Sequence, residues 1–188
     1  MKRGHWIAAL ALSTLVAGGC ADCPDGGALS GEANKEQWCQ KVGPSGAVKH
    51  GPYRKWHASG KLFVEGAYRD GAPDGRWQYF GEDGKKLGEC TLTDRTGTWS
   101  SWLPGGQSWE TGDYYQGQKV GQWQSWWRNG KKNKDEQYKD GKLHGRSKVW
   151  HESGQLFFDG QYREGEKCGT WTYHLAETSK TEEHPPCK

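Results

Sequence analysis

Residues 121–132, GQWQSWWRNGKK, place three tryptophans within twelve positions of a polar chain. An exposed indole ring can stack on a flat ligand or accept an apolar side chain, so this stretch could form a binding site. The same rings could instead build a core, because the chain has 12 Trp, 8 Tyr and 4 Phe but only 32% hydrophobic residues. The spacing of the other aromatic residues decides between these interpretations.

The first 19 residues have the pattern of an export signal. Lys2 and Arg3 precede residues 6–17, WIAALALSTLVA, an apolar run too short to span a bilayer and typical of a signal peptide. The run ends in AGGC, which resembles a bacterial lipobox and would make Cys20 the lipidated first residue of the mature chain. Cleavage before Cys20 without lipidation is the alternative. By resemblance to lipoproteins of diderm bacteria, Ala21 after the cysteine indicates an outer-membrane anchor.

The remaining cysteines would lie in an oxidising compartment after export. The local pairings Cys23–Cys39 and Cys168–Cys187 are favoured there, which leaves Cys90 as a free and buried thiol. The CADC stretch at residues 20–23 has the spacing of a redox C-x-x-C motif. Because it overlaps the processing site and no βαβ pattern follows, we expect no redox role for it.

The charge of the mature chain excludes a polyanion as an electrostatic partner. Removing residues 1–19 removes two of the 26 basic residues, so 24 basic residues face 23 acidic ones and the net charge is +1. Such a balance produces no field that would steer nucleic acid toward the protein. We therefore expect no nucleic-acid partner.

A repeat of about 24 residues organises the chain. Glycines at positions 51, 75, 97, 121, 145 and 169 are separated by 24, 22, 24, 24 and 24 residues. Counted from each of these glycines, aromatic residues recur at offsets 2, 5 and 17, and a further glycine recurs at offset 9. Trp123 and Trp126 thus occupy repeated positions, and the repeat predicts that they are structural.

Each repeat is predicted to be a β-hairpin. The dipeptides at offsets 8 and 9 end in glycine and are typical of a two-residue type I′ turn. Such a turn places Arg54 opposite Glu65 and Lys148 opposite Asp159, and it also pairs the rings of Trp56 and Phe63. The residue at offset 2, a ring in all but one copy, then faces a mostly small residue at offset 15.

The fold class that follows is all-β: an elongated, single-layer antiparallel meander of about five consecutive hairpins over residues 48–174. Residues 20–47 form a lead segment, in which Trp38 and Cys39 would make a capping strand. Residues 175–188 form a polar tail that we expect to be mobile unless Cys187 holds it.

The repeats HGPYRKWHASGKLFVEGAYRDG and GQWQSWWRNGKKNKDEQYKDGKLHG resemble the MORN-variant repeat of the YwqK-type antitoxin family. The pattern is an aromatic residue two positions after a glycine, a second aromatic residue three positions later, an x-Gly turn and then E-G-x-Y-x-x-G. The chain departs from it at Ser147, at Glu136 in place of glycine and in the shortened second repeat. The resemblance implies a sheet of consecutive hairpins and a binding or scaffolding module; the antitoxins themselves are cytoplasmic.

No catalytic or metal-binding pattern appears in the sequence. There is no G-x-S-x-G, and the Gly-Lys pairs at the turns lack the rest of a phosphate-binding loop. His50 and His144 share one repeat position and His57 and His151 another, so each pair is far apart and lacks a third ligand. We expect no enzyme activity, no metal and no cofactor.

Two tryptophans exceed the repeat pattern and are the candidate ligand contacts. Trp127 is at offset 6, where other copies carry His, Gly or Leu, and we expect its ring to be exposed. Trp109 is at offset 12, where other copies carry Phe or Leu, and is expected in the core.

The function that we expect is an envelope-tethered, non-enzymatic module that binds or scaffolds an unidentified protein, anchored to the membrane by its N-terminal lipid. One alternative is binding of cell-wall glycan through exposed rings. The other is an antitoxin or immunity protein that neutralises a partner toxin.

Overall fold

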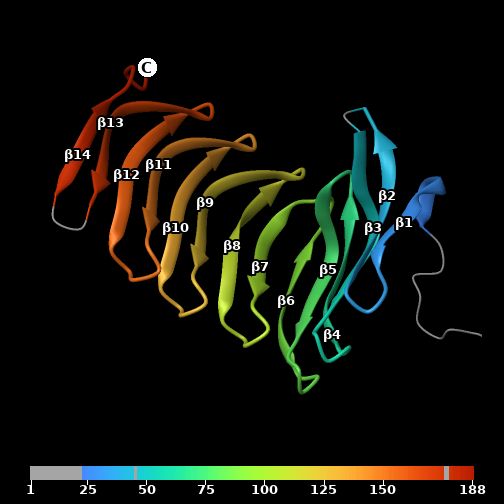
Figure 1. Cartoon of the computed structure of the whole chain (residues 1–188). Helices are drawn as coiled ribbons and strands as arrows, with labels where there is room; N and C mark the ends of the chain where they lie inside the picture. Colours follow the sequence, from blue (N-terminus) through green and yellow to red (C-terminus); the bar gives the residue numbers. More distant parts are fainter. Residues whose placement is uncertain (1–22, 45, 176–177) are drawn as a thin grey trace, which may run out of the picture.

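The computed structural model describes residues 23–44, 46–175 and 178–188, and their regular structure is almost entirely β-strand (Figure 1). The predicted export signal and the lipidation site Cys20 lie outside these residues. A short 3-10 turn, η1 (Pro24–Gly26), precedes the first strand. The strands are β1 (Ala28–Glu32), β2 (Glu36–Gly43), β3 (Gly46–Trp56), β4 (Leu62–Arg69), β5 (Ala72–Phe80), β6 (Lys86–Leu92), β7 (Gly97–Trp102), β8 (Ser108–Tyr115), β9 (Gln118–Trp126), β10 (Lys132–Lys139), β11 (Lys142–Trp150), β12 (Leu156–Arg163), β13 (Glu166–His174) and β14 (Ser179–Glu183).

Consecutive strands pair antiparallel and form a row of hairpins, which confirms the predicted all-β meander. The five repeats are the hairpins β3–β4, β5–β6, β7–β8, β9–β10 and β11–β12, and β13 begins a sixth copy. Figure 1 shows these hairpins side by side, with β1 and β2 at one end of the row and β14 at the other. Trp38 and Cys39 lie in β2, which pairs with β3.

The ladder of backbone hydrogen bonds is interrupted once, between β6 and β7. Strands β1–β6 form one sheet and β7–β14 another, and only the isolated bridge between Thr93 and Thr96 joins them. This interruption, which we call the seam, follows the two-residue deletion in the second repeat. Cys90 also stands here at the offset that is glycine in most repeats.

The turns within the hairpins differ from the prediction. In the first hairpin, the N–H of Gly60 donates to the carbonyl of His57 at 2.9 Å, and only Gly60 of the turn has a positive φ. This is a three-residue loop with a glycine bulge rather than a type I′ turn. Turns with two positive φ values lie instead between hairpins, as at Asp70 (52°) and Gly71 (83°).

The bulge shifts the register near each turn. The polar pairs Arg54–Glu65 and Lys148–Asp159 stand opposite each other as predicted. Beyond the bulge, however, Trp56 is opposite Leu62, so the predicted pairing of Trp56 with Phe63 is wrong. A one-residue shift changes the face to which a side chain points, because strand side chains alternate.

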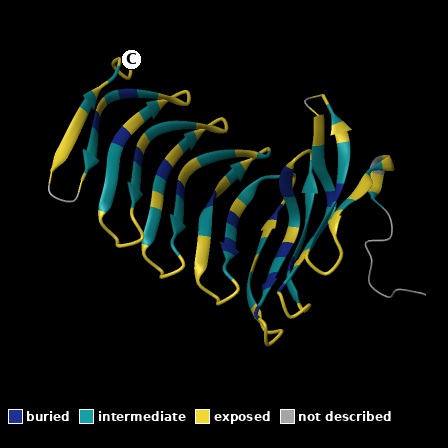
Figure 2. Cartoon of the chain, viewed as in Figure 1, coloured by how far each residue is buried: buried dark blue, intermediate teal, exposed yellow. Residues whose placement is uncertain are grey.

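One face of the meander carries the core, and we call it the aromatic face. The rings at offset 2 are buried there, and the offset-17 tyrosines Tyr68, Tyr114 and Tyr162 pack edge-on against the ring of the next repeat. Tyr68 and Trp77 have centroids 5.1 Å apart, and Tyr162 and Trp171 have centroids 4.9 Å apart. Figure 2 shows buried segments in the middle of the strands and exposed turns at both ends.

Both ends of the row are closed by disulfides with the pairings that the sequence favours. Cys23 bonds Cys39, and Cys168 bonds Cys187. The second bond ties down the segment predicted as a polar tail, and β14 in that segment pairs with β13. The charged, exposed strand β14 therefore ends the row.

Candidate functional site

A groove of about 680 Å³ lies on the aromatic face. We call it the aromatic groove. Its apolar wall comes from both sides of the seam and includes Trp56, Phe63, Tyr79, Trp102, Leu103 and Trp109. Ligand sites are commonly concave and mostly apolar with a few polar groups, so this groove is the first candidate site.

The register shift explains why rings gather in the groove. Strict alternation would put Phe63 and Trp102 on the face opposite the core. Instead Phe63 packs on Tyr79 with centroids 5.9 Å apart, and Trp102 packs on the same ring at 5.2 Å. Trp102 therefore lies on the core face, at the end of β7 where the register shifts.

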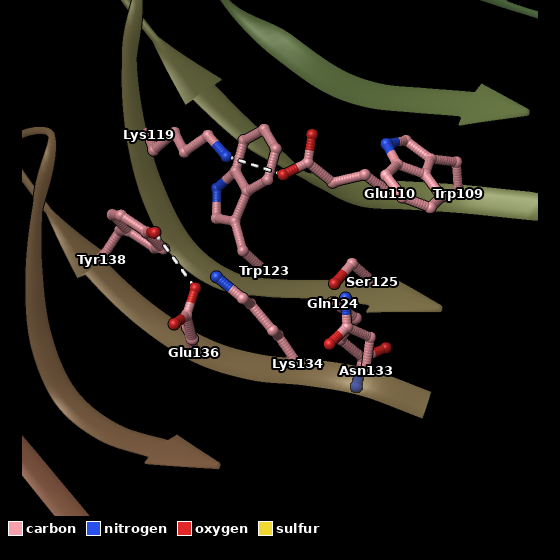
Figure 3. Close-up of a pocket in the computed structure, with 10 residues that line it drawn as sticks. All are labelled: Trp109, Glu110, Lys119, Trp123, Gln124, Ser125, Asn133, Lys134, Glu136 and Tyr138. Atoms are coloured by element: carbon pink, nitrogen blue, oxygen red, sulfur yellow. Dashed lines mark hydrogen bonds and ion pairs between the residues drawn. The ribbon is translucent and has the colours of Figure 1, made fainter. Parts of the chain in front are cut away.

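A second, more polar cavity of about 270 Å³ adjoins the groove and shares Trp109 and Glu110 with it (Figure 3). We call it the polar pocket. Its lining residues are Trp109 and Glu110 on β8, Lys119, Trp123, Gln124 and Ser125 on β9, and Asn133, Lys134, Glu136 and Tyr138 on β10. The three adjacent strands hold these side chains in fixed positions.

The charged groups of the polar pocket are held by neighbours. Lys119 Nζ lies 2.8 Å from a carboxylate oxygen of Glu110 and 3.7 Å from the centre of the Trp123 ring. The hydroxyl of Tyr138 donates to Glu136 at 3.1 Å. Both contacts are drawn in Figure 3. A cation over an indole ring and beside a carboxylate is stabilised by both.

Glu136 stands at the offset that is glycine in most repeats, and Ser147 replaces the ring that would cover it. At this offset, a Cβ added to Gly112 or Gly160 would lie 2.3 Å from the indole of the next repeat. Glu136 cannot fit beneath such a ring. The opposite residue on β11 is Ser147, which is 1% exposed, so a small residue makes room for a large one. These two departures from the repeat compensate each other.

Trp127 is not the exposed ring that its sequence position predicted. Its side chain is partly buried, and its indole N–H donates to the carbonyl of Trp150 at 3.0 Å. His57 occupies the same offset, and its Nε2 lies 2.8 Å from the carbonyl of Phe80, the equivalent residue of the next repeat. The residue at offset 6 therefore bridges neighbouring hairpins, and Trp127 performs this structural role.

Trp109 also differs from its prediction, but it is more exposed than expected and not more buried. It was expected in the core, yet 41% of it is exposed, and it lines both the aromatic groove and the polar pocket. The register shift pairs Trp102 with Ser108 and leaves Trp109 out of the predicted ring pair. Of the two candidate contacts, Trp109 is the one that the structure places in a cavity.

Glu110, Lys119 and Glu136 were not identified as candidates from the sequence. The signal for Glu136 was present, because it departs from glycine and Ser147 departs from an aromatic residue. The signal for Lys119 is a lysine that recurs two residues before the repeat glycine, also at Lys49 and Lys167. These lysines lie over rings as well: Lys49 Nζ is 4.8 Å from the centroid of Trp38, and Lys167 Nζ is 4.5 Å from the centroid of Trp171.

Burial dominates the titration of the aromatic face. Burial raises the pKa of Tyr68 to about 12, with the Glu36 carboxylate adding to the shift. The pKa of Tyr138 is also raised, first by burial and then by the charge of Glu136. The phenols of this face are thus neutral hydrogen-bond donors at physiological pH.

Cys90 is partly buried and unpaired in the described chain, as predicted for a free thiol. Its Sγ–H donates to the carbonyl of Ser100 across the seam at 3.3 Å. Burial raises the pKa of this thiol, which lowers its thiolate fraction and hence its reactivity.

Within residues 23–44, 46–175 and 178–188, no group of three His, Cys, Asp or Glu side chains is arranged to hold a metal ion. The same residues contain no helix long and apolar enough to cross a membrane.

Comparison with known families finds the MORN repeat variant at residues 49–70, 119–140 and 143–164. Each match begins two residues before the repeat glycine and ends at the first residue of the turn to the next hairpin. It therefore covers one hairpin, that of the first, fourth or fifth repeat. No curated protein matches the chain. The hairpins that build the aromatic face are therefore, at these three places, MORN-variant repeats.

Proposed function

We propose that the protein is a non-enzymatic binding module that holds a segment of a partner protein in the aromatic groove. The observation that carries this proposal is the groove itself, which is lined by rings from several hairpins. MORN-type repeats are generally non-enzymatic modules, which supports binding rather than catalysis.

The lining of the groove favours a polypeptide with apolar side chains. Leu103 and Trp109 offer apolar surface with few hydrogen-bonding groups, and burying apolar area stabilises a complex by about 25 cal/mol per Å² before the costs of association. Aromatic residues are enriched at protein interfaces for this reason. A groove over several strands suits an extended segment better than a small molecule.

Two cations, Lys55 and Arg128, and two carboxylates, Glu82 and Glu110, line the groove. Glu110 is paired with Lys119, and Arg128 is the group that favours a carboxylate in the part of the segment beside it. Arg128 lines the groove, is exposed and has no ion-pair partner among the described residues. Lys55, also exposed, is 3.7 Å from Glu36 and only loosely paired. A guanidinium that is free to make two parallel hydrogen bonds recognises a carboxylate well.

Attachment to the cell envelope is a further part of the proposal. The signal-like residues 1–19 and the AGGC stretch support export and lipidation at Cys20. The two disulfides are consistent with an oxidising compartment. An outer-membrane position, if the source is a diderm bacterium, extends the same interpretation.

Co-purification of groove variants tests the binding proposal. The full chain, expressed with its leader and mildly cross-linked in the envelope, should recover a stoichiometric protein. Leu103→Glu should abolish this recovery, because it places a charge on the apolar wall of the groove. Val42→Glu, at an 88% exposed position outside the groove, should leave recovery unchanged. Equal recovery with all variants would contradict the proposal.

A toxin is one kind of partner that the resemblance to the YwqK-type antitoxins suggests. It predicts a neighbouring gene whose product is toxic when expressed alone and harmless when expressed with this chain. Toxicity that persists on co-expression would exclude this version of the proposal and leave the groove open to other proteins.

A further inference from the structure

We propose that the polar pocket binds a neutral pyranose unit of a glycan, with Trp109 as the stacking platform. This site is separate in chemistry from the apolar wall of the aromatic groove, although the two share Trp109 and Glu110. The proposal does not depend on the protein partner.

The pocket is specific to the fourth repeat. Glu136 is only 9% exposed and occupies an offset where most repeats carry glycine. Burying a carboxylate costs free energy unless it is hydrogen-bonded, and only one of its oxygens has a partner, the Tyr138 hydroxyl, among the described residues. The other carboxylate oxygen of Glu136, which lines the pocket, can therefore accept a hydrogen bond from a ligand.

The charges of the pocket balance and therefore disfavour ionic ligands. Lys119 and Lys134 supply two positive charges, and Glu110 and Glu136 supply two negative ones. Because these charges cancel, neither an anion nor a cation gains a net Coulomb attraction that would offset the loss of its hydration. A neutral ligand does not have this cost.

A sugar has the hydrogen-bonding groups that this lining requires. Its hydroxyls can donate to the carboxylates of Glu110 and Glu136 and accept from the ammonium of Lys134 and the amide of Asn133. Apolar side chains of a protein would leave these groups without hydrogen-bond partners, which disfavours their binding in this pocket.

Trp109 supplies the apolar contact that a pyranose also needs. Its ring is 41% exposed and stands at the rim, next to Glu110 (Figure 3). The C–H face of a pyranose ring packs against an indole through dispersion and the removal of water. Trp123 on the other side is covered by Lys119 and is buried, so it serves as a wall rather than a platform.

Calorimetric titration of the folded chain with oligosaccharides tests the proposal. The probes are the tetramers of N-acetylglucosamine, β-1,4-glucose and α-1,4-glucose as neutral ligands and tetragalacturonate as an acidic one. At least one neutral tetramer should bind saturably and more tightly than the acidic one. Trp109→Ala should weaken that binding about tenfold or more, which corresponds to about 1.4 kcal/mol.

Two further variants separate recognition from folding. Glu136→Gln keeps the size of the side chain and should weaken binding while the circular dichroism spectrum is unchanged. Tyr115→Ala removes another exposed ring from β8, one that is 57% exposed and outside the pocket, and should not affect affinity. Failure of every neutral tetramer to bind, preference for the acidic tetramer, or full affinity in folded Trp109→Ala would each overturn the proposal.

Discussion

At the scale of single residues, the fold depends on glycines that lie directly beneath indole rings. Gly160 lies beneath Trp171, and Gly112 lies beneath Trp123. Each of these glycines has an ordinary negative-φ backbone, so the requirement is space and not conformation. The absence of a side chain is what lets the buried ring of the next repeat approach the sheet.

Gly160→Ala should destabilise the protein by about 1–3 kcal/mol, because the new methyl group would overlap the Trp171 indole in a packed core. Chemical denaturation with tryptophan fluorescence measures the change. Gly43→Ala is the matched control, since its Cβ would meet nothing closer than 3.5 Å. An equal effect of the two substitutions would show that the ring contact is not the cause.

The exchange at positions 136 and 147 makes a prediction of coupling. Ser147→Trp alone should be strongly destabilising because the ring would meet Glu136, and Glu136→Gly alone should leave a cavity. The double variant restores the glycine-and-ring pair of the other repeats. It should therefore be more stable than the sum of the two single effects by about 1–3 kcal/mol. Strict additivity in denaturation experiments would contradict this account of the pocket.

At the scale of elements, the seam between β6 and β7 has an identifiable local cause. The equivalent junction of β4 and β5 has Gly66 beneath Trp77, whereas Cys90 holds the corresponding position of β6 at the seam. We infer that the cysteine side chain takes the space that an approaching ring would require. Its thiol satisfies the Ser100 carbonyl, which lacks the usual ladder partner. The aromatic groove crosses this junction, so its width depends on the seam.

Cys90→Gly should therefore extend the ladder across the seam. The expected result is slower amide hydrogen exchange in β7 than in the natural chain, because the strand gains backbone hydrogen bonds. Cys90→Ala keeps the Cβ and should not slow exchange. If both variants exchange alike, the two-residue deletion rather than Cys90 determines the seam.

The elements also show how far sequence reasoning reaches. The repeat predicted the hairpins and the Arg54–Glu65 register, because regularly spaced glycines fix where strands begin and end. The Ser-Gly and Asn-Gly turns are compatible with a type I′ turn and with a three-residue loop, and the choice between them decides where Trp102 and Trp109 point. Glu136 and Ser147 could be recognised in the sequence as departures from the repeat pattern. That they lie opposite each other depends on the turn between β10 and β11.

At the scale of the whole molecule, buried phenols should limit stability at high pH. Burial raises the pKa of Tyr53, Tyr68, Tyr79, Tyr114 and Tyr138 above the value of about 10 in an unfolded chain. Their stabilising contribution is complete below about pH 10 and is lost as the pH rises toward 12, the folded value for Tyr68, because only the unfolded chain releases these protons in that range.

Alkaline titration followed by tyrosinate absorbance and circular dichroism measures this effect. Ionisation of the buried tyrosines should coincide with cooperative loss of β-structure above pH 10. If these tyrosines ionise near pH 10 while the β-sheet signal in circular dichroism stays intact, the aromatic face is open to solvent. That result would contradict the prediction.

The central claim is that the aromatic groove is the surface that holds a partner protein. Site-specific photocross-linking in the intact envelope tests it most directly, with p-benzoylphenylalanine at Leu103 in the groove and, separately, at Val42 on the exposed hairpin end. We predict one dominant protein adduct from Leu103 that is lost in Arg128→Glu and is absent from Val42. No adduct from Leu103, or the same adduct from both positions, would contradict the account.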